Sequence, residues 1–125
     1  MRRLAPLLPL AMLLIAGCVT EDRFETATAS AVDGNAVVIE MDDMLYRPDR
    51  LEVPAGEPVT IVLENHGGIV HDLVFEDGWA SGEVPPGQAA TVAFGPFVTG
   101  TVGWCSVPGH RDAGMELEIV VVPGS

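Results

Sequence analysis

Lysine is absent from this 125-residue chain, and its six arginines face 18 aspartates and glutamates, which gives a formal net charge of −12. Nucleic-acid-binding proteins draw much of their affinity from lysines and arginines that neutralise phosphates, so this composition argues against such a function. Anionic lipid head groups would also repel the chain. We therefore expect the folded domain to stand away from a membrane surface and any charged protein partner to be basic, unless the acids serve solubility alone.

A long apolar run is missing as well. The run from Leu4 to Ile15 contains two prolines and is shorter than the roughly 20 residues that a membrane-spanning helix needs. Two arginines precede it, which is typical of an export signal. It ends in Ile15-Ala16-Gly17-Cys18, which resembles the lipobox of bacterial lipoproteins. We expect residues 1–17 to be a signal peptide and a lipid on Cys18 to anchor the chain to the cell membrane outside the cytoplasm. An ordinary secretory signal is the alternative, and the export route stays open.

Cysteine is scarce, because the chain holds only Cys18 and Cys105. If Cys18 carries a lipid, Cys105 has no partner with which to form an intramolecular disulfide. A lone thiol outside the cytoplasm is open to oxidation unless it is buried or bound to something. Cys105 is therefore a candidate ligand.

The chain divides into a tether and one domain. After Cys18, residues 19–33 are rich in Thr, Ala, Ser and acids, which predicts that 18–33 form a flexible tether. From Gly34 to Ser125, glycine- and proline-rich turn signals separate short apolar runs, and no window has a convincing helical period. This pattern predicts an all-β sandwich or barrel of about seven or eight strands. The apolar runs are 36–41, 58–64, 69–75, 89–94, 99–105 and 115–122.

Alternation along two of these runs indicates which side chains point inward. Met115 falls on the same face as Leu117 and Ile119, while the glutamates between them fall on the other face. By the same count His71 faces the core with Leu73. Cys105 ends the strand before the nine-residue loop 106–114, Met115 opens the next strand, and both ends of the loop should lie at one end of the sandwich.

The donor types in this region suit copper. A thiolate, two imidazoles and a weakly bound thioether form the set that holds copper in electron-transfer sites. Cys105, His110 and Met115 stand five residues apart, Pro108 and Gly109 supply the bend, and His71 is the remote donor whose direction fits. The alternative is a buried thiol, a hydrogen-bonded core histidine and a packed methionine.

Other donors carry weaker hypotheses. His66 does not continue the inward face, so we expect a surface side chain, although it could replace His71 as the ligand. Met41 and Met44 could bind additional copper, but Met41 more simply packs as a strand residue.

The stretch "NHGGIVHDLVF", followed by "GTVGWCSVPGHRDAGM" and a Val-rich final strand, resembles the cupredoxins, the small blue copper proteins. The Cys-x4-His-x4-Met spacing is more like auracyanin or sulfocyanin than plastocyanin. The opening "VVIEMDDMLYRPDRLEVPAGEPVTIVLEN" also resembles the first strands of that family. The resemblance covers roughly residues 36–122 and implies a Greek-key β-sandwich. It further implies a type 1 copper ion held by His71, Cys105, His110 and Met115.

Two positions depart from the family pattern. Asp72 follows His71 where many cupredoxins have an asparagine that braces the copper loop, and its carboxylate could accept a hydrogen bond from the Ser106 region while adding charge beside the metal. Gly103 stands where a large inward aromatic residue is usual, so we expect looser packing or a bulge under the site.

We therefore expect a membrane-anchored carrier that passes single electrons outside the cytoplasm and is not an enzyme. His110 would present its edge to the partner, and Val107, Pro108 and Ala113 would form the docking rim around it. The partner would be a redox protein with a basic face, a cytochrome or a copper oxidase, and the carrier itself a monomer. Two alternatives remain: a copper carrier that delivers metal to an extracytoplasmic oxidase, and a metal-free interaction domain.

Overall fold

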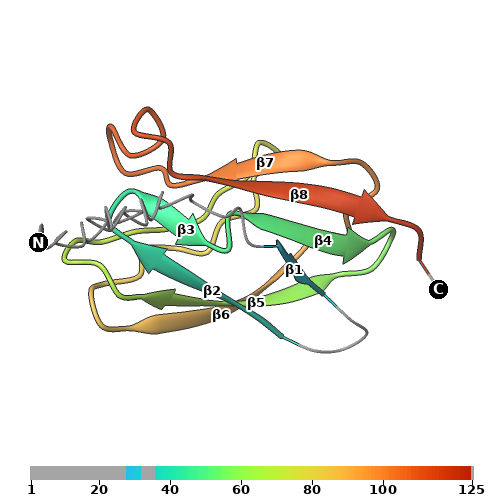
Figure 1. Ribbon diagram of the computed structural model, residues 1–125, viewed down its shortest axis with the longest axis horizontal. Helices are drawn as coiled ribbons and strands as arrows, with labels where there is room; N and C mark the ends of the chain where they lie inside the picture. The colour runs from blue at the N-terminus through green and yellow to red at the C-terminus, as the bar shows by residue number, and fades with distance from the viewer. Residues whose placement is uncertain (1–27, 32–35, 125) are drawn as a thin grey trace, which may run out of the picture.

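The described part of the chain is an all-β sandwich, as predicted (Figure 1). The computed structural model describes residues 28–31 and 36–124, and within them it has two sheets of four strands each and no helix. Accordingly, no helix in this part could cross a membrane. The strands are β1 Thr28–Ser30, β2 Val37–Asp42, β3 Leu45–Arg47, β4 Arg50–Pro54, β5 Val59–Asn65, β6 Ala89–Phe94, β7 Thr101–Trp104 and β8 Glu116–Val122.

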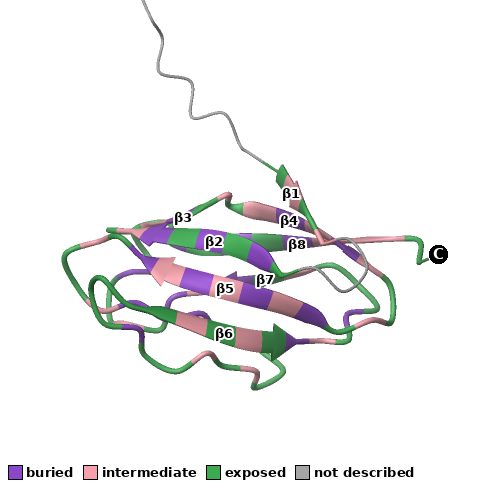
Figure 2. Ribbon diagram, turned by 90° about the horizontal axis from the view of Figure 1, so that it is seen from below, coloured by how far each residue is buried: buried purple, intermediate pink, exposed green. Residues whose placement is uncertain are grey.

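The two sheets face each other across one core. One sheet has the order β1-β4-β8-β7 and the other β3-β2-β5-β6, with parallel pairing between β2 and β5, between β4 and β8, and between β1 and β4. Buried and exposed residues alternate along β2, as Figure 2 shows. Alternate residues of a strand point to opposite faces, so one face of β2 lines the core. The loop between β7 and β8 projects at the end of the sandwich opposite to the C-terminus (Figure 1).

The run at 69–75 does not form the regular strand that we predicted. His71 forms an isolated bridge with Val84, and Val74 forms one with Ala80 and one with Trp104. Each bridge is a single pair of residues. The segment forms some of its backbone hydrogen bonds with the chain that follows it and others with β7, so it does not form a continuous ladder with either. The inward direction of His71 and Leu73 holds all the same, since both side chains have no exposed surface.

Three short strands fall outside the runs that we picked. β3 follows β2 and β4 follows β3. β3 is only three residues long, and in β4 charged residues interrupt the apolar ones. β1 pairs in parallel with β4 from Thr28 to Ser30, so the tether expected over 18–33 does not extend through these residues. The predicted signal peptide, the lipidated Cys18 and the rest of the tether lie outside the described residues.

Packing around Gly103 is tight, and the expectation of looser packing there was wrong. Gly103 is buried, and a Cβ atom added to it would lie 2.7–2.8 Å from ring atoms of Phe75 and from Cδ1 of Leu73. The space that a large residue at 103 would fill is therefore occupied by side chains from the irregular segment. Glycine at this position allows the close approach of Phe75.

Candidate metal centre

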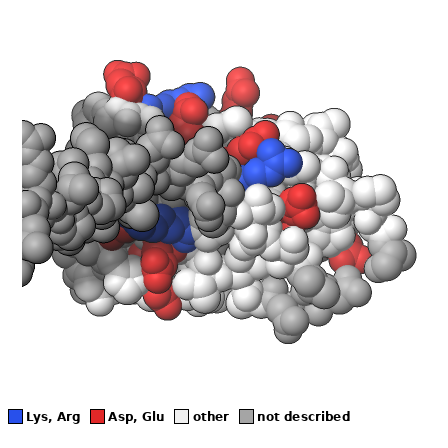
Figure 3. All heavy atoms as spheres, in the orientation of Figure 1, with Lys and Arg blue, Asp and Glu red and all other residues white. Residues whose placement is uncertain are grey.

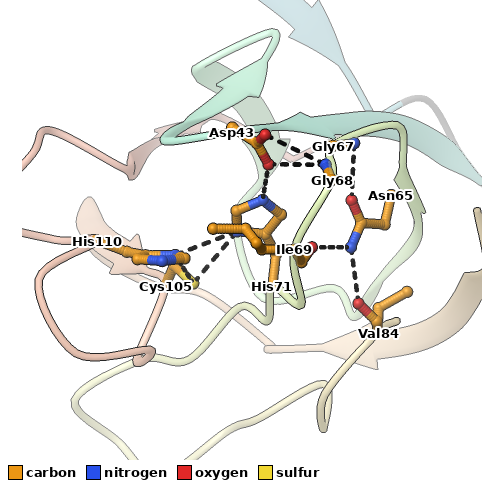
Figure 4. A network of polar contacts seen from close by, with 9 residues as sticks. All are labelled: Asp43, Asn65, Gly67, Gly68, Ile69, His71, Val84, Cys105 and His110. Atoms are coloured by element: carbon orange, nitrogen blue, oxygen red, sulfur yellow. Dashed lines mark hydrogen bonds and ion pairs between the residues drawn. The ribbon is translucent and has the colours of Figure 1, made fainter. Parts of the chain in front are cut away.

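Three of the four predicted ligands meet at a single point inside the sandwich (Figure 4). Cys105 Sγ lies 3.4 Å from His110 Nδ1 and 3.9 Å from His71 Nδ1, and the two Nδ1 atoms are 3.2 Å apart. All three residues are buried, with His110 the most accessible at 5 % exposure.

The loop between β7 and β8 holds Cys105 and His110 in place through its backbone. Cys105 N–H donates to the carbonyl of Met115 at 3.2 Å, which closes the loop at its base. At the tip, His110 N–H donates to the carbonyl of Val107 at 3.0 Å, and Gly109 has a φ of 83°. A proline followed by a glycine in the left-handed region suits a type II turn. This turn carries His110 back over Cys105, as the sequence predicted.

The remaining imidazole, that of His71, comes from the irregular segment 69–75 that precedes β6. His71 exchanges backbone hydrogen bonds with Val84, and Val74 exchanges them with Trp104, the neighbour of Cys105. The segment is thus fastened on one side to its own hairpin and on the other to β7. This double attachment brings the imidazole of His71 to the thiol of Cys105, although the two residues are 34 positions apart.

Met115, the predicted axial donor, is buried at the base of the ligand loop, directly before β8. Its side chain has no exposed surface, and its backbone N–H donates to the carbonyl of His110 at 3.1 Å. Leu117 and Ile119 continue the same buried face, as the alternation indicated. Met115 is therefore bonded through its backbone to both ligands of the loop.

Asp72 and Ser106 brace the centre from the side. Asp72 Oδ1 accepts a hydrogen bond from Ser106 N–H at 2.6 Å, and its other oxygen accepts one from the Ser106 hydroxyl. Tyr46, which is buried in β3, donates its hydroxyl hydrogen to the carbonyl of Asp72. Burial raises the pKa of the Cys105 thiol, and the negative charge of Asp72 adds to that rise. A metal ion must therefore displace the thiol proton as it binds.

Sequence reasoning missed two polar residues that support His71. Asp43, in the turn between β2 and β3, has Oδ1 at 3.1 Å from His71 Nε2, and the hydrogen bond from His71 lowers the pKa of its carboxyl group. Asn65, the last residue of β5, donates to the carbonyls of Ile69 and Val84 at 2.8 Å, and so ties the start of the segment to the bridge partner of His71. Neither role has a clear signal in the sequence, since Asp43 is one acid among 18 and Asn65 only a strand end.

The weaker donor hypotheses resolve differently. His66 is exposed, pairs with Glu64 at 3.0 Å and lies apart from the buried donors, in a separate surface group with Glu40 and Glu64. Met41 is completely buried in the core, whereas Met44 is partly exposed at the β2–β3 turn. Both findings match the simpler interpretation of these side chains.

The three predicted docking residues lie on the same loop as His110. Val107 is half-buried, and Pro108 and Ala113 are exposed on the same loop as His110. The docking role of these three residues stays a prediction, since the structure gives only their exposure and their place on the loop.

The spacing of the three donors fits one metal ion. First-row metal ions bind imidazole nitrogen at about 2.0–2.1 Å and thiolate sulfur at about 2.3 Å, so donors around a single ion lie roughly 3.2–4 Å apart. The three distances here, 3.2, 3.4 and 3.9 Å, fall in that range. Two imidazoles, a thiolate and a methionine form the donor set typical of electron-transfer copper sites, and Met115 is buried and bonded through its backbone to the ligand loop.

Replacing Asp72 with asparagine should raise the reduction potential of the copper-loaded protein by roughly 40–90 mV. A side-chain amide can still bond Ser106, but the negative charge that favours Cu(II) over Cu(I) is gone, and about 1–2 kcal/mol of charge interaction corresponds to that shift for a one-electron couple. Potentiometric titration measures it. Asp112→Asn, which removes an exposed charge from the β7–β8 loop, is the matched control, and an equal shift in both variants would contradict a local effect.

Comparisons with known proteins identify the family and the fold of the chain. Residues 9–107 match the family described as "Cupredoxin-like domain", a match that includes His71 and Cys105 and ends before His110 and Met115. A search of curated proteins gives no match.

Solved structures share the fold at low sequence identity. Reduced auracyanin from Roseiflexus castenholzii has a TM-score of 0.64 and 21% identity over 70% of this chain and 97% of its own. Auracyanin A from Chloroflexus aurantiacus has a TM-score of 0.59 and 19% identity over 70% of this chain and 100% of its own. The metal-binding domain of the Cu(I)-exporting P-type ATPase CopA of Streptococcus pneumoniae was solved with Cu(I). It has a TM-score of 0.60 and 16% identity over 78% of this chain and 97% of its own.

Proposed function

Because the chain belongs to the cupredoxin-like domain family, we propose that it is a type 1 copper protein that carries single electrons between redox partners. The observation that carries this proposal is the convergence of Cys105 Sγ with the Nδ1 atoms of His71 and His110 in a buried site. A copper ion bound there supplies one-electron exchange between Cu(I) and Cu(II).

The residues of the chain contribute rigidity and access. Backbone hydrogen bonds fix the ligand loop at its base and tip, and the segment of His71 is fastened to β7. Donors held in this way move little when the charge at the centre changes, which favours fast transfer. His110 would serve as the exit for the electron, because it is the most accessible of the three donors and the docking rim of Val107, Pro108 and Ala113 lies on its loop.

We expect no enzymatic turnover at this centre. Four protein donors leave no open coordination position for a substrate. The two nearby carboxylates are engaged as well, Asp43 with His71 and Asp72 with Ser106. Neither is placed as a free general base.

The first test is the visible spectrum of the purified protein, loaded with copper and oxidised. An electron carrier should be intensely blue, hold its copper through dialysis against a chelator, and cycle reversibly in a potentiometric titration. A colourless protein, or one that exchanges Cu(I) readily without redox cycling, would instead favour a copper carrier. The shared fold with the Cu(I)-bound CopA domain is the observation that keeps this second function in consideration.

Met115→Leu should leave copper bound but raise the reduction potential. The substitution nearly conserves volume, so we expect a stability cost below about 1.5 kcal/mol. It removes the weak axial donor, whose identity tunes the potential, and the loss of a donor disfavours Cu(II). Metal analysis and potentiometry check both parts. Complete loss of copper from this variant would contradict the role of Met115 as only a weak ligand.

We further propose that the partner has a basic docking face and that a lipid on Cys18 holds the carrier at the outer side of the cell membrane. Without Arg2 and Arg3, four arginines remain against the same 18 acids, a formal balance of −14. Figure 3 shows acidic side chains spread over one face with few basic ones between them. Every arginine of the described residues lies in an ion pair: Arg47 with Asp42, Arg50 with Glu118, and Arg111 with Glu116.

The rate of electron transfer to a basic redox protein should fall by about 10-fold or more between low salt and roughly 0.5 M salt. Long-range attraction between opposite charges accelerates encounter by about 10–10³-fold and is screened within about 10 Å at 0.1 M ionic strength. Stopped-flow mixing with a basic cytochrome measures the rate, and a neutral small-molecule reductant is the control. A rate that does not depend on salt would rule out steering by the acidic surface.

A further inference from the structure

A carboxylate from another part of the chain reaches the far side of His71. Asp43 and Met44 form the two-residue turn between β2 and β3, and Asp43 Oδ1 lies 3.1 Å from His71 Nε2 (Figure 4). The side chain of His71 has no exposed surface, whereas that of Asp43 is 52% exposed. Asp43 is therefore the hydrogen-bond partner of an imidazole nitrogen that solvent does not reach.

This contact decides which nitrogen of His71 can bind a metal. An ionised carboxylate only accepts hydrogen bonds, so Nε2 must carry the proton that it shares with Asp43. In a neutral imidazole the other nitrogen then has a free lone pair. That nitrogen is Nδ1, the atom that faces Cys105 Sγ and His110 Nδ1.

The backbone around Asp43 leaves room for its carboxylate to reach His71. A Cβ atom on Gly67 would lie 2.3 Å from Asp43 Oδ1 and 3.0 Å from His71 Nε2, so only glycine leaves room for the carboxylate. Gly68 N–H donates to both oxygens of Asp43 at 3.0 and 3.2 Å and aims them at the imidazole. Met44 has a φ of 70°, a strained value for a residue with a side chain, and it completes the turn that presents Asp43.

We propose that Asp43 is a positioning residue of the metal centre, which holds His71 in its Nε2–H tautomer and makes the imidazole a stronger donor to Cu(II) than to Cu(I). This inference rests on the proposed copper function. Carboxylates that bond the outer nitrogen of a ligating histidine fix its orientation and increase its basicity, and their removal typically costs about 10–100-fold in metal affinity. Here the negative charge acts on the copper through His71, without contact between Asp43 and the metal.

Three variants separate this role from a merely structural one. Asp43→Ala removes the acceptor and the charge, while Asp43→Asn removes the charge but keeps an acceptor oxygen. Asp42→Asn is the matched control, because Asp42 is the neighbouring acid and pairs with Arg47 at 2.9 Å. A thermal melt of each metal-free variant establishes that it is folded, and Asp43→Asn alone still decides the question if the alanine variant does not fold.

The first readout is metal affinity and reduction potential. Asp43→Ala should weaken Cu(II) binding by about 10–100-fold and Cu(I) binding by less. Each tenfold difference between the two affinities raises the potential by about 59 mV for a one-electron couple. Asp43→Asn should shift the potential in the same direction by a smaller amount, and Asp42→Asn should match the unsubstituted protein.

The second readout needs no metal. Nitrogen NMR of the His71 ring in the metal-free protein should show the proton on Nε2 in the unsubstituted chain, in Asp42→Asn and in Asp43→Asn, and a loss of this preference in Asp43→Ala. A proton on Nδ1 of the unsubstituted protein, or a potential in both Asp43 variants equal to that of Asp42→Asn, would overturn the proposal. If the unsubstituted protein bound no copper, the proposed function would fail while the tautomer would still report on Asp43.

Discussion

Cys105→Ser should abolish the intense visible absorption of the oxidised, copper-loaded protein. The colour of such a centre comes from charge transfer between a thiolate and Cu(II), and Cys105 supplies the only thiol of the described residues. A hydroxyl group stays protonated at neutral pH and binds copper poorly, so the affinity for Cu(II) should fall by more than the 10–100-fold that changes outside the ligand shell cause. Absorption spectroscopy and a competition titration with a chelator measure the two effects.

The matched control for this experiment is His66→Gln. His66 is a histidine of the same domain, but it is exposed and pairs with Glu64 away from the converging donors. Its replacement should leave both colour and affinity unchanged. A serine variant that stays blue, or a glutamine variant that loses its colour, would contradict the assignment of the centre to Cys105, His71 and His110.

Gly103→Ala should destabilise the folded protein by about 1–3 kcal/mol, the usual cost of overpacking a core. The added methyl group would fall 2.7–2.8 Å from Phe75 and Leu73, so these side chains or the backbone of β7 must move. For a domain of this size the change corresponds to a melting temperature lower by roughly 4–8 °C per kcal/mol. Differential scanning calorimetry of the metal-free protein checks it.

Gly68→Ala provides the comparison. Its Cβ atom would lie 3.5 Å from the nearest atom outside its chain neighbours, which is ordinary contact distance. Alanine also restricts the unfolded chain more than glycine does, so this variant should be neutral or slightly stabilised. An equal melting temperature for Gly103→Ala and Gly68→Ala would contradict the prediction. It would mean that the core accommodates the added methyl group without loss of stability.

The fold class was predictable because its signal is strong and local. β2, β5, β6 and β8 each alternate or concentrate apolar residues over six or seven positions, and turn residues bound them. β3 has only three residues, although it pairs with the adjacent β2, whereas β1 and β4 are short or interrupted by charged residues and pair with strands remote in the chain. Their pairing depends on tertiary contacts that periodicity does not record.

In the candidate metal centre, too, the features with a local sequence pattern were predictable and those that depend on tertiary contacts were not. Cys105, His110 and Met115 stand together in the sequence, and the inward direction of His71 follows from its neighbours Leu73 and Phe75. The contact between Asp43 and His71 has no such pattern, because it depends on how the β2–β3 turn meets the glycines after β5. The packing at Gly103 could not be judged either, since the residues that fill the space come from the irregular segment.

The ion pairing of the three described arginines also bears on encounters between two copies of the protein. With each guanidinium already neutralised by an acid, a second copy meets a surface of uncompensated negative charge. Self-exchange of electrons between identical molecules is therefore opposed by mutual repulsion, and added salt should accelerate it. If the protein carries electrons as proposed, the acids that would attract a basic partner would also slow electron exchange between identical carriers.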